Sequence, residues 1–124
     1  MKVLITAVGG DLAQSALNCL RDSDWTGEIW GWDTQNWPAG RALVDQFRVA
    51  PPASDEAAYR DALEELVREE GIDVVVPLCE PEIRCLSRWH HEGRALPCRV
   101  LVNPWPEVER FSDKWLTTCY LRAQ

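Results

Sequence analysis

The stretch Lys2–Leu20, KVLITAVGGDLAQSALNCL, decides the fold of this chain. Residues 3–5 form a short apolar run, which predicts a buried strand. The run stops before Gly9 and Gly10, and apolar residues then return at helical spacing in a helix that opens on Asp11. A strand, a glycine turn and a helix in this order are typical of the start of nucleotide-binding α/β folds.

The glycine turn has two interpretations. Gly9 and Gly10 could adopt positive φ and let the backbone approach a ligand, with the helix N-terminus facing an anion. They could also form a plain strand-to-helix turn that binds nothing. The dinucleotide pattern G-x-G-x-x-G is not present, and Asp11 places a negative charge where a phosphate would lie. We therefore expect a backbone that a substrate can approach closely, but a poor phosphate site.

Composition excludes several classes of function. A chain of 124 residues predicts one domain with a real core, and a net charge of −7 without a basic patch argues against nucleic-acid binding. The apolar runs are too short to span a bilayer, and no signal peptide precedes the first strand. Five cysteines without a C-x-x-C pair fit a reduced protein. We expect a cytoplasmic protein with no nucleic-acid or membrane partner.

Cysteine and histidine spacing gives little support for a zinc site. Cys85, His90 and His91 could be ligands, but their spacing on one helix puts them on different faces.

Five of the seven tryptophans form two groups. Trp30 and Trp32 are expected in the core. Trp25, Trp37 and Trp105 lie in predicted turns, which is typical of a surface that packs against a partner.

Apolar patterning predicts five strands that alternate with helices. The strands are expected at residues 3–5, 28–33, 46–50, 72–78 and 99–102. The helices after the first are expected to begin at the N-cap Ser54, at Pro81, at Pro104 and at Ser112. Alternation with short connections indicates parallel strands and right-handed crossovers. The predicted fold is α/β: a three-layer, doubly wound parallel sheet of about five strands in the order 3-2-1-4-5.

A sheet of this order places its ligand crevice outside the carboxyl ends of strands 1 and 4. The residues predicted to bind substrate at that edge are Gly9, Gly10, Asp11, Asp33, Glu80 and Glu82. Asp33 lies where the nucleotide fold places an acid that bonds a ribose hydroxyl, or it could cap a turn. The carboxylates suit an amine-bearing substrate, or a magnesium ion shared with a phosphate supplied elsewhere. Since no Ser-His-acid arrangement is apparent, we expect the reaction to be completed outside this chain.

Four stretches together carry a family resemblance. They are KVLITAVGGDLAQSAL, GWDTQNWPAGRALVDQFRVAPPASD, IDVVVPLCEPE and FSDKWLTTCYLRAQ. With this spacing, the whole chain resembles the Rossmann-like, pre-ATP-grasp amino-terminal domain of ATP-grasp carboxylate–amine ligases, especially the carbamoyl-phosphate-synthase-large-subunit-like group. The resemblance implies activation of a carboxylate as an acyl phosphate, followed by attack of an amine.

The resemblance also implies roles for individual residues and partners. It suggests that Lys114 approaches the ATP phosphates, and that Glu80 and Glu82 hold the acceptor substrate. It implies a Rossmann-like domain at 1–111 and a helix at 112–124 that leads toward an ATP-grasp domain. ATP and Mg²⁺ would bind mostly to that domain, which this sequence lacks. We therefore expect a fragment of a longer ligase, or half of a split enzyme, that is inactive alone and compatible with a homodimer.

Two other functions fit the sequence less fully. One is a small Rossmann-type nucleotide-binding module, based on the opening stretch and Asp33. The other is a non-catalytic interaction domain that docks a partner through its exposed tryptophans.

Overall fold

The computed structural model describes residues 1–124 and alternates strands with helices. The strands are β1 (Lys2–Thr6), β2 (Glu28–Asp33), β3 (Gln46–Val49), β4 (Val74–Val76) and β5 (Arg99–Val100). The α-helices are α1 (Asp11–Asp22), α2 (Glu56–Glu70), α3 (Glu80–His91), α4 (Trp105–Ser112) and α5 (Lys114–Arg122). A short 3-10 helix, η1 (Ala39–Leu43), lies between β2 and β3.

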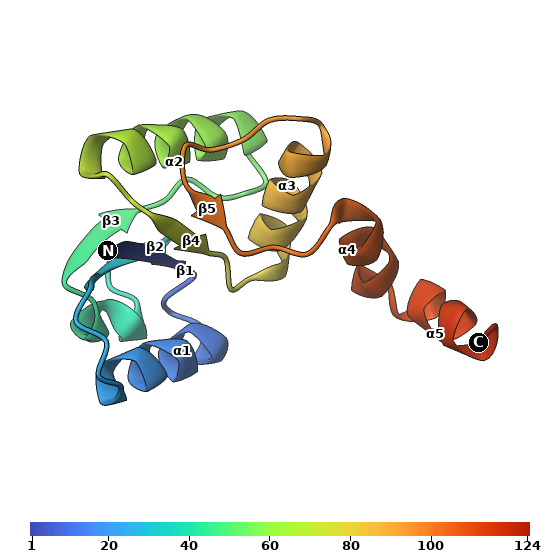
Figure 1. Cartoon of the computed structure of the whole chain (residues 1–124), viewed down its shortest axis with the longest axis horizontal. Helices are drawn as coiled ribbons and strands as arrows, with labels where there is room; N and C mark the ends of the chain where they lie inside the picture. Colours follow the sequence, from blue (N-terminus) through green and yellow to red (C-terminus); the bar gives the residue numbers. More distant parts are fainter.

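The five strands form one parallel sheet in the order β3-β2-β1-β4-β5. Helices α2 and α3 cover one face of this sheet, and α1 with η1 lies against the other (Figure 1). The predicted three-layer, doubly wound architecture and its strand order are confirmed. Because β1 is central and the order reverses between β1 and β4, the carboxyl ends of these two strands define the crevice.

Each face of the sheet has its own core. Alternate residues of β1 point to opposite faces, so Leu4 packs in the cluster under α2 and α3, whereas Val3 and Ile5 pack under α1. Trp30 and Trp32 lie in the first cluster, as predicted, with exposed fractions of 6% and 0%. Trp32 packs edge-on against Tyr59 of α2, with ring centroids 6.1 Å apart.

The ends of some elements differ from the prediction. Asp55, not Ser54, caps α2, because its carboxylate accepts a hydrogen bond from the Ala58 N–H at 3.2 Å. Strand β4 is shorter than the apolar run 72–78, because Pro77 has no N–H to donate to a neighbouring strand. Gly71 ends α2 in the left-handed conformation with a φ of 64°, as predicted.

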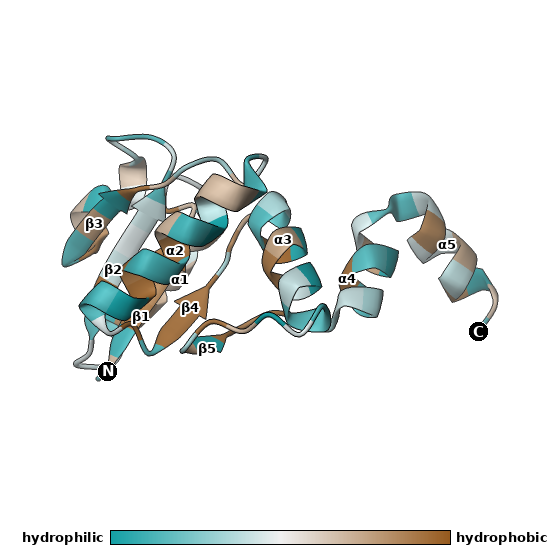
Figure 2. Cartoon of the chain, turned by 90° about the horizontal axis from the view of Figure 1, so that it is seen from above, coloured by the Kyte–Doolittle hydropathy of each residue, from teal (hydrophilic) through white to brown (hydrophobic).

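Helices α4 and α5 extend from the sheet toward the C-terminus (Figure 1). Helix α4 packs against α3 and buries Val108, but α5 has no buried residue. Helix α5 carries several hydrophobic residues (Figure 2), of which Trp115 and Leu121 are 68% and 63% exposed. Asp113 caps α5 by accepting hydrogen bonds from the N–H groups of Trp115 and Leu116.

The three tryptophans predicted to lie in turns differ in exposure, and Trp105 is instead the first residue of α4. Trp37 is 78% exposed, whereas Trp25 and Trp105 are half-buried. No helix has the length and apolar character that crossing a membrane requires.

Substituting Gly40 with alanine tests the packing of η1 against the β1–α1 loop. The Gly40 N–H donates to the Val8 carbonyl at 3.0 Å, and a Cβ on Gly40 would lie 2.2 Å from that oxygen. We expect Gly40→Ala to lower the free energy of unfolding by about 2–3 kcal/mol, measured by urea denaturation. Gly71→Ala is the control: its Cβ would meet no atom within 4 Å, so only the positive φ costs stability, about 1 kcal/mol. Equal losses in the two variants would contradict this packing.

Candidate functional site

A hydrogen bond connects the glycine turn after β1 to Asp33 at the end of β2. One Asp33 carboxylate oxygen accepts a hydrogen bond from the Gly9 N–H at 2.8 Å, and the other accepts one from the Gln35 N–H at 2.9 Å. Asp33 is only 9% exposed, so both bonds are shielded from water. The acid that sequence analysis placed near a ribose hydroxyl thus holds two loops together.

The expectation that Gly9 and Gly10 adopt positive φ is wrong. The left-handed residue of the turn is Ala7, with a φ of 51°, whereas Gly10 has a φ of −85°. The space around Gly9 is tight, because a Cβ there would lie 3.2 Å from an Asp33 carboxylate oxygen. The Gly10 N–H donates to the Ala7 carbonyl at 2.9 Å. Both glycine N–H groups are therefore committed within the chain, and exposed Asp11 adds a negative charge beside them.

A buried carboxylate fastens the second side of the crevice. Glu82, on the first turn of α3, is 6% exposed and accepts a hydrogen bond from the hydroxyl of Thr6, the last residue of β1. It accepts another from the Cys79 thiol at 3.0 Å. Thr6 in turn accepts a bond from the Leu78 N–H at 3.2 Å. These bonds fix the β4–α3 corner against the end of β1.

Burial sets the protonation of this corner. It raises the pKa of Glu82, although the bonds from Thr6 and Cys79 partly oppose the shift. Burial, with the nearby Glu82, also raises the pKa of Cys79 to about 12, so this sulfur stays a thiol and is a poor nucleophile. The Tyr59 hydroxyl lies close to Glu82 and is buried without a partner in hydrogen-bonding geometry, and its pKa is raised mainly by that burial.

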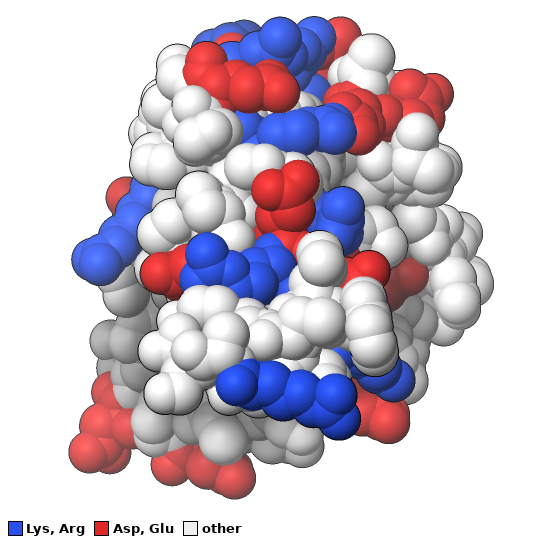
Figure 3. Space-filling model, turned by 90° about the vertical axis from the view of Figure 1, so that its right-hand side faces the viewer, with Lys and Arg blue, Asp and Glu red and all other residues white.

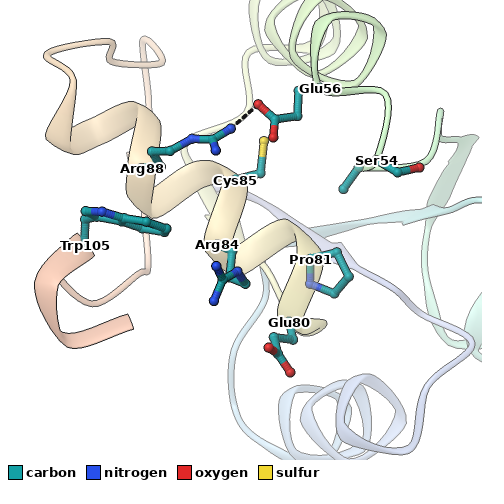
Figure 4. A pocket seen from close by; sticks show the side chains of 9 residues that line it. Ser54, Glu56, Glu80, Pro81, Arg84, Cys85, Arg88 and Trp105 are labelled. Carbon is teal, nitrogen blue, oxygen red and sulfur yellow. Dashed lines mark hydrogen bonds and ion pairs between the residues drawn. The ribbon is translucent and has the colours of Figure 1, made fainter. Parts of the chain in front are cut away.

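Glu80 lies two residues before Glu82 but faces outward. It is exposed, and its carboxylate makes no ion pair or hydrogen bond within the chain. It lines a pocket of about 380 Å³ between α3, the start of α2 and the start of α4 (Figure 4). Of the two glutamates, Glu80 is the one available to a ligand.

The pocket beside Glu80 has a mixed charge. Arg88 forms an ion pair with Glu56 across the pocket, and Arg84 lies over the ring of Trp105 at 5.6 Å (Figure 4). Sequence analysis missed this pocket, because its walls come from three separate helices. The signal present in the sequence was a charged stripe at four-residue spacing on α3, formed by Glu80 and the two arginines.

Lys114 lies apart from the other predicted residues. It is exposed at the start of α5, on the segment that extends beyond the sheet (Figure 1). On the face viewed from that end, basic and acidic side chains are interspersed (Figure 3). No group of three or more His, Cys, Asp or Glu side chains could hold a metal ion.

A known family model matches most of the chain. Residues 3–101 match the PylC-like N-terminal domain, which includes every strand of the sheet and both sides of the crevice. The chain belongs to the PylC-like N-terminal domain family. No curated protein matches the sequence of this PylC-like domain.

Solved structures similar to the PylC-like domain have the same fold. N5-carboxyaminoimidazole synthetase from Staphylococcus aureus, complexed with ADP, matches 98% of the chain with a TM-score of 0.67 and 15% identity. Glycinamide-RNase-transformylase T from Mycobacterium tuberculosis matches 95% with a TM-score of 0.61 and 14% identity. N5-carboxyaminoimidazole ribonucleotide synthetase from Thermotoga maritima matches 98% with a TM-score of 0.57 and 18% identity.

These similarities identify the fold of the N-terminal domains of ATP-grasp ligases. The PylC-like domain spans only 29%, 33% and 30% of the three proteins, in the order given.

Replacing Glu82 with glutamine tests the buried corner. The raised pKa means that the folded protein holds this proton more tightly than the unfolded chain does. Stability of the native protein should therefore fall as pH rises above the ordinary glutamate value near 4.5. Glutamine cannot ionise, so the free energy of unfolding of Glu82→Gln should rise relative to that of the native protein between pH 4.5 and 7. The expected rise is about 1.4 kcal/mol for each unit by which the Glu82 pKa is raised.

Urea denaturation at several pH values measures this difference. Glu65→Gln, at an exposed position of α2, is the matched control and should show no such trend. A difference in the free energy of unfolding between Glu82→Gln and the native protein that stays constant with pH would argue against a raised pKa. So would a difference that changes with pH in the opposite direction.

Proposed function

We propose that this chain is the substrate-side N-terminal domain of an ATP-grasp ligase, which activates a carboxylate as an acyl phosphate for attack by an amine. The observation that carries this proposal is the family match over residues 3–101. The parallel sheet with its crevice at β1 and β4 supports it, since ATP-grasp ligases share this N-terminal fold.

The acidic edge of the sheet suits the amine side of such a reaction. We assign Glu80 to the cationic or amine-bearing group of the substrate, because its carboxylate is exposed and unpaired at the crevice. Gly10 and Asp11 border the same edge from the β1 side. Asp33 and Glu82 act indirectly, since their hydrogen bonds hold the two loops in place.

ATP and Mg²⁺ are assigned to an ATP-grasp domain outside these 124 residues. The edge offers no cluster of free carboxylates for the metal, because Asp33 and Glu82 are already bonded within the chain. We propose that 1–111 is the substrate-side domain, and that Lys114 on the exposed helix approaches the ATP phosphates. All five cysteines are free, which supports a reducing, cytoplasmic location.

An ADP-release assay tests this function. The chain alone should not hydrolyse ATP. An ATP-grasp domain can be supplied by fusion to the chain or by co-expression. ADP release should then require both a carboxylate and an amine, and mixtures of the common amino acids serve as probes. In that active protein, Glu80→Gln should lower kcat/KM at least tenfold because it removes the charge that holds the amine.

Glu65→Gln again provides the control and should change kcat/KM less than twofold. Robust ATP turnover by residues 1–124 alone would contradict the proposal. So would equal activity of the two variants.

A further inference from the structure

Two charged groups of the pocket, Arg84 and Glu80, have no partner of opposite charge. Arg88 is paired with Glu56, and its Nε lies 3.9 Å from a Glu92 oxygen. Arg84, one turn earlier on α3, has no carboxylate within 4.0 Å, even though Glu80 lies four residues before it. Its recorded contact is the ring of Trp105. The pocket thus contains a guanidinium with unused hydrogen-bond donors.

The contact with Trp105 leaves the guanidinium free to meet an anion. Its central carbon lies 5.6 Å from the centroid of the Trp105 ring, a cation–π contact that uses none of the N–H donors for a hydrogen bond. A guanidinium edge matches a carboxylate with two parallel hydrogen bonds, which a lysine ammonium cannot reproduce. Figure 4 shows Arg84 between Trp105 and Pro81, with Ser54 on the opposite side of the pocket.

The charges of the pocket favour a monoanion over a dianion. Two acids and two arginines line the pocket, so its formal charge is zero, and the pair Arg88–Glu56 is internally neutral. A carboxylate at Arg84 leaves the exposed Glu80 to water or to a cationic group of the same molecule, whereas a phosphate dianion would add a second negative charge beside Glu56 and Glu80. The volume of about 380 Å³ is in the range of small-molecule sites.

We propose that this pocket binds the carboxylate of a small organic molecule. Arg84 would donate two hydrogen bonds to the carboxylate, and Trp105 would position the Arg84 guanidinium. The proposal rests on the proposed function only where it links this pocket to the ligase reaction, since Glu80 lines the pocket and also lies at the crevice. Binding of the carboxylate requires only the residues of this chain. The competing explanation is that Arg84 only fastens α4 to α3, which predicts a loss of stability without any ligand.

An NMR titration separates these explanations. The indole N–H signal of Trp105 is assigned with Trp105→Phe and followed in the native chain at pH 7 and constant ionic strength. The probes are sodium butyrate, inorganic phosphate and n-butylammonium chloride. We expect a saturable shift with butyrate, at least tenfold weaker binding of phosphate, and an affinity for butyrate that n-butylammonium does not lower, since the amine would contact Glu80 and not Arg84.

Variants identify the residue that binds. Arg84→Gln should raise the Kd for butyrate at least tenfold, whereas Arg94→Gln, at an exposed arginine outside the pocket, should change it less than twofold. Should Arg84→Gln unfold, Arg84→Lys keeps the charge and should still weaken binding several-fold, because it lacks the paired donors.

The proposal is overturned by no saturable shift with butyrate, by equal affinity for phosphate, or by native-like binding in both Arg84 variants. Retained butyrate binding in a protein that lacks ligase activity would overturn only the proposed function. Ligase activity in a protein that does not bind butyrate would overturn only this inference.

Discussion

The arrangement of the crevice depends on one buried hydrogen bond, from the Thr6 hydroxyl to the Glu82 carboxylate. It joins the last residue of the central strand to the helix that follows the neighbouring strand, at the point where the strand order reverses. Thr6 is fully buried, so losing the Glu82 acceptor would leave the hydroxyl proton without an acceptor, at a cost of about 1–3 kcal/mol. On the other side of the crevice, Asp33 fixes the glycine turn by accepting a hydrogen bond from the Gly9 N–H.

This division leaves the two glutamates of α3 with different tasks. Glu82 points inward and fixes the corner, and Glu80 points outward beside the pocket. A fixed backbone around an exposed carboxylate is what a substrate-side domain requires, because small displacements of a binding group weaken catalysis sharply. The free edge of Arg84 lies on the same helix, one turn away from Glu80. A single helix thus carries both charges.

Much of the fold was predictable from the sequence, because it depends on local patterns. The apolar runs predicted the strands, and the helical spacing with the Gly71 cap predicted α2. The alternation of strands and helices predicted the parallel sheet. The interior bonds were not predictable, since Asp33 and Gly9 are 24 residues apart and Glu82 and Thr6 are 76 apart. The positive φ of Ala7 was also missed, because alanine has no preference for that conformation.

The most direct test of this account is a carboxyl ¹³C NMR titration of the chain, with the Glu82 signal assigned by Glu82→Gln. Glu82 lies in the interior, where it supports the crevice instead of meeting solvent. We therefore expect a Glu82 pKa clearly above the ordinary value near 4.5. A pKa at or below that value would show a solvated or ion-paired carboxylate and would contradict the buried corner on which the proposed site depends.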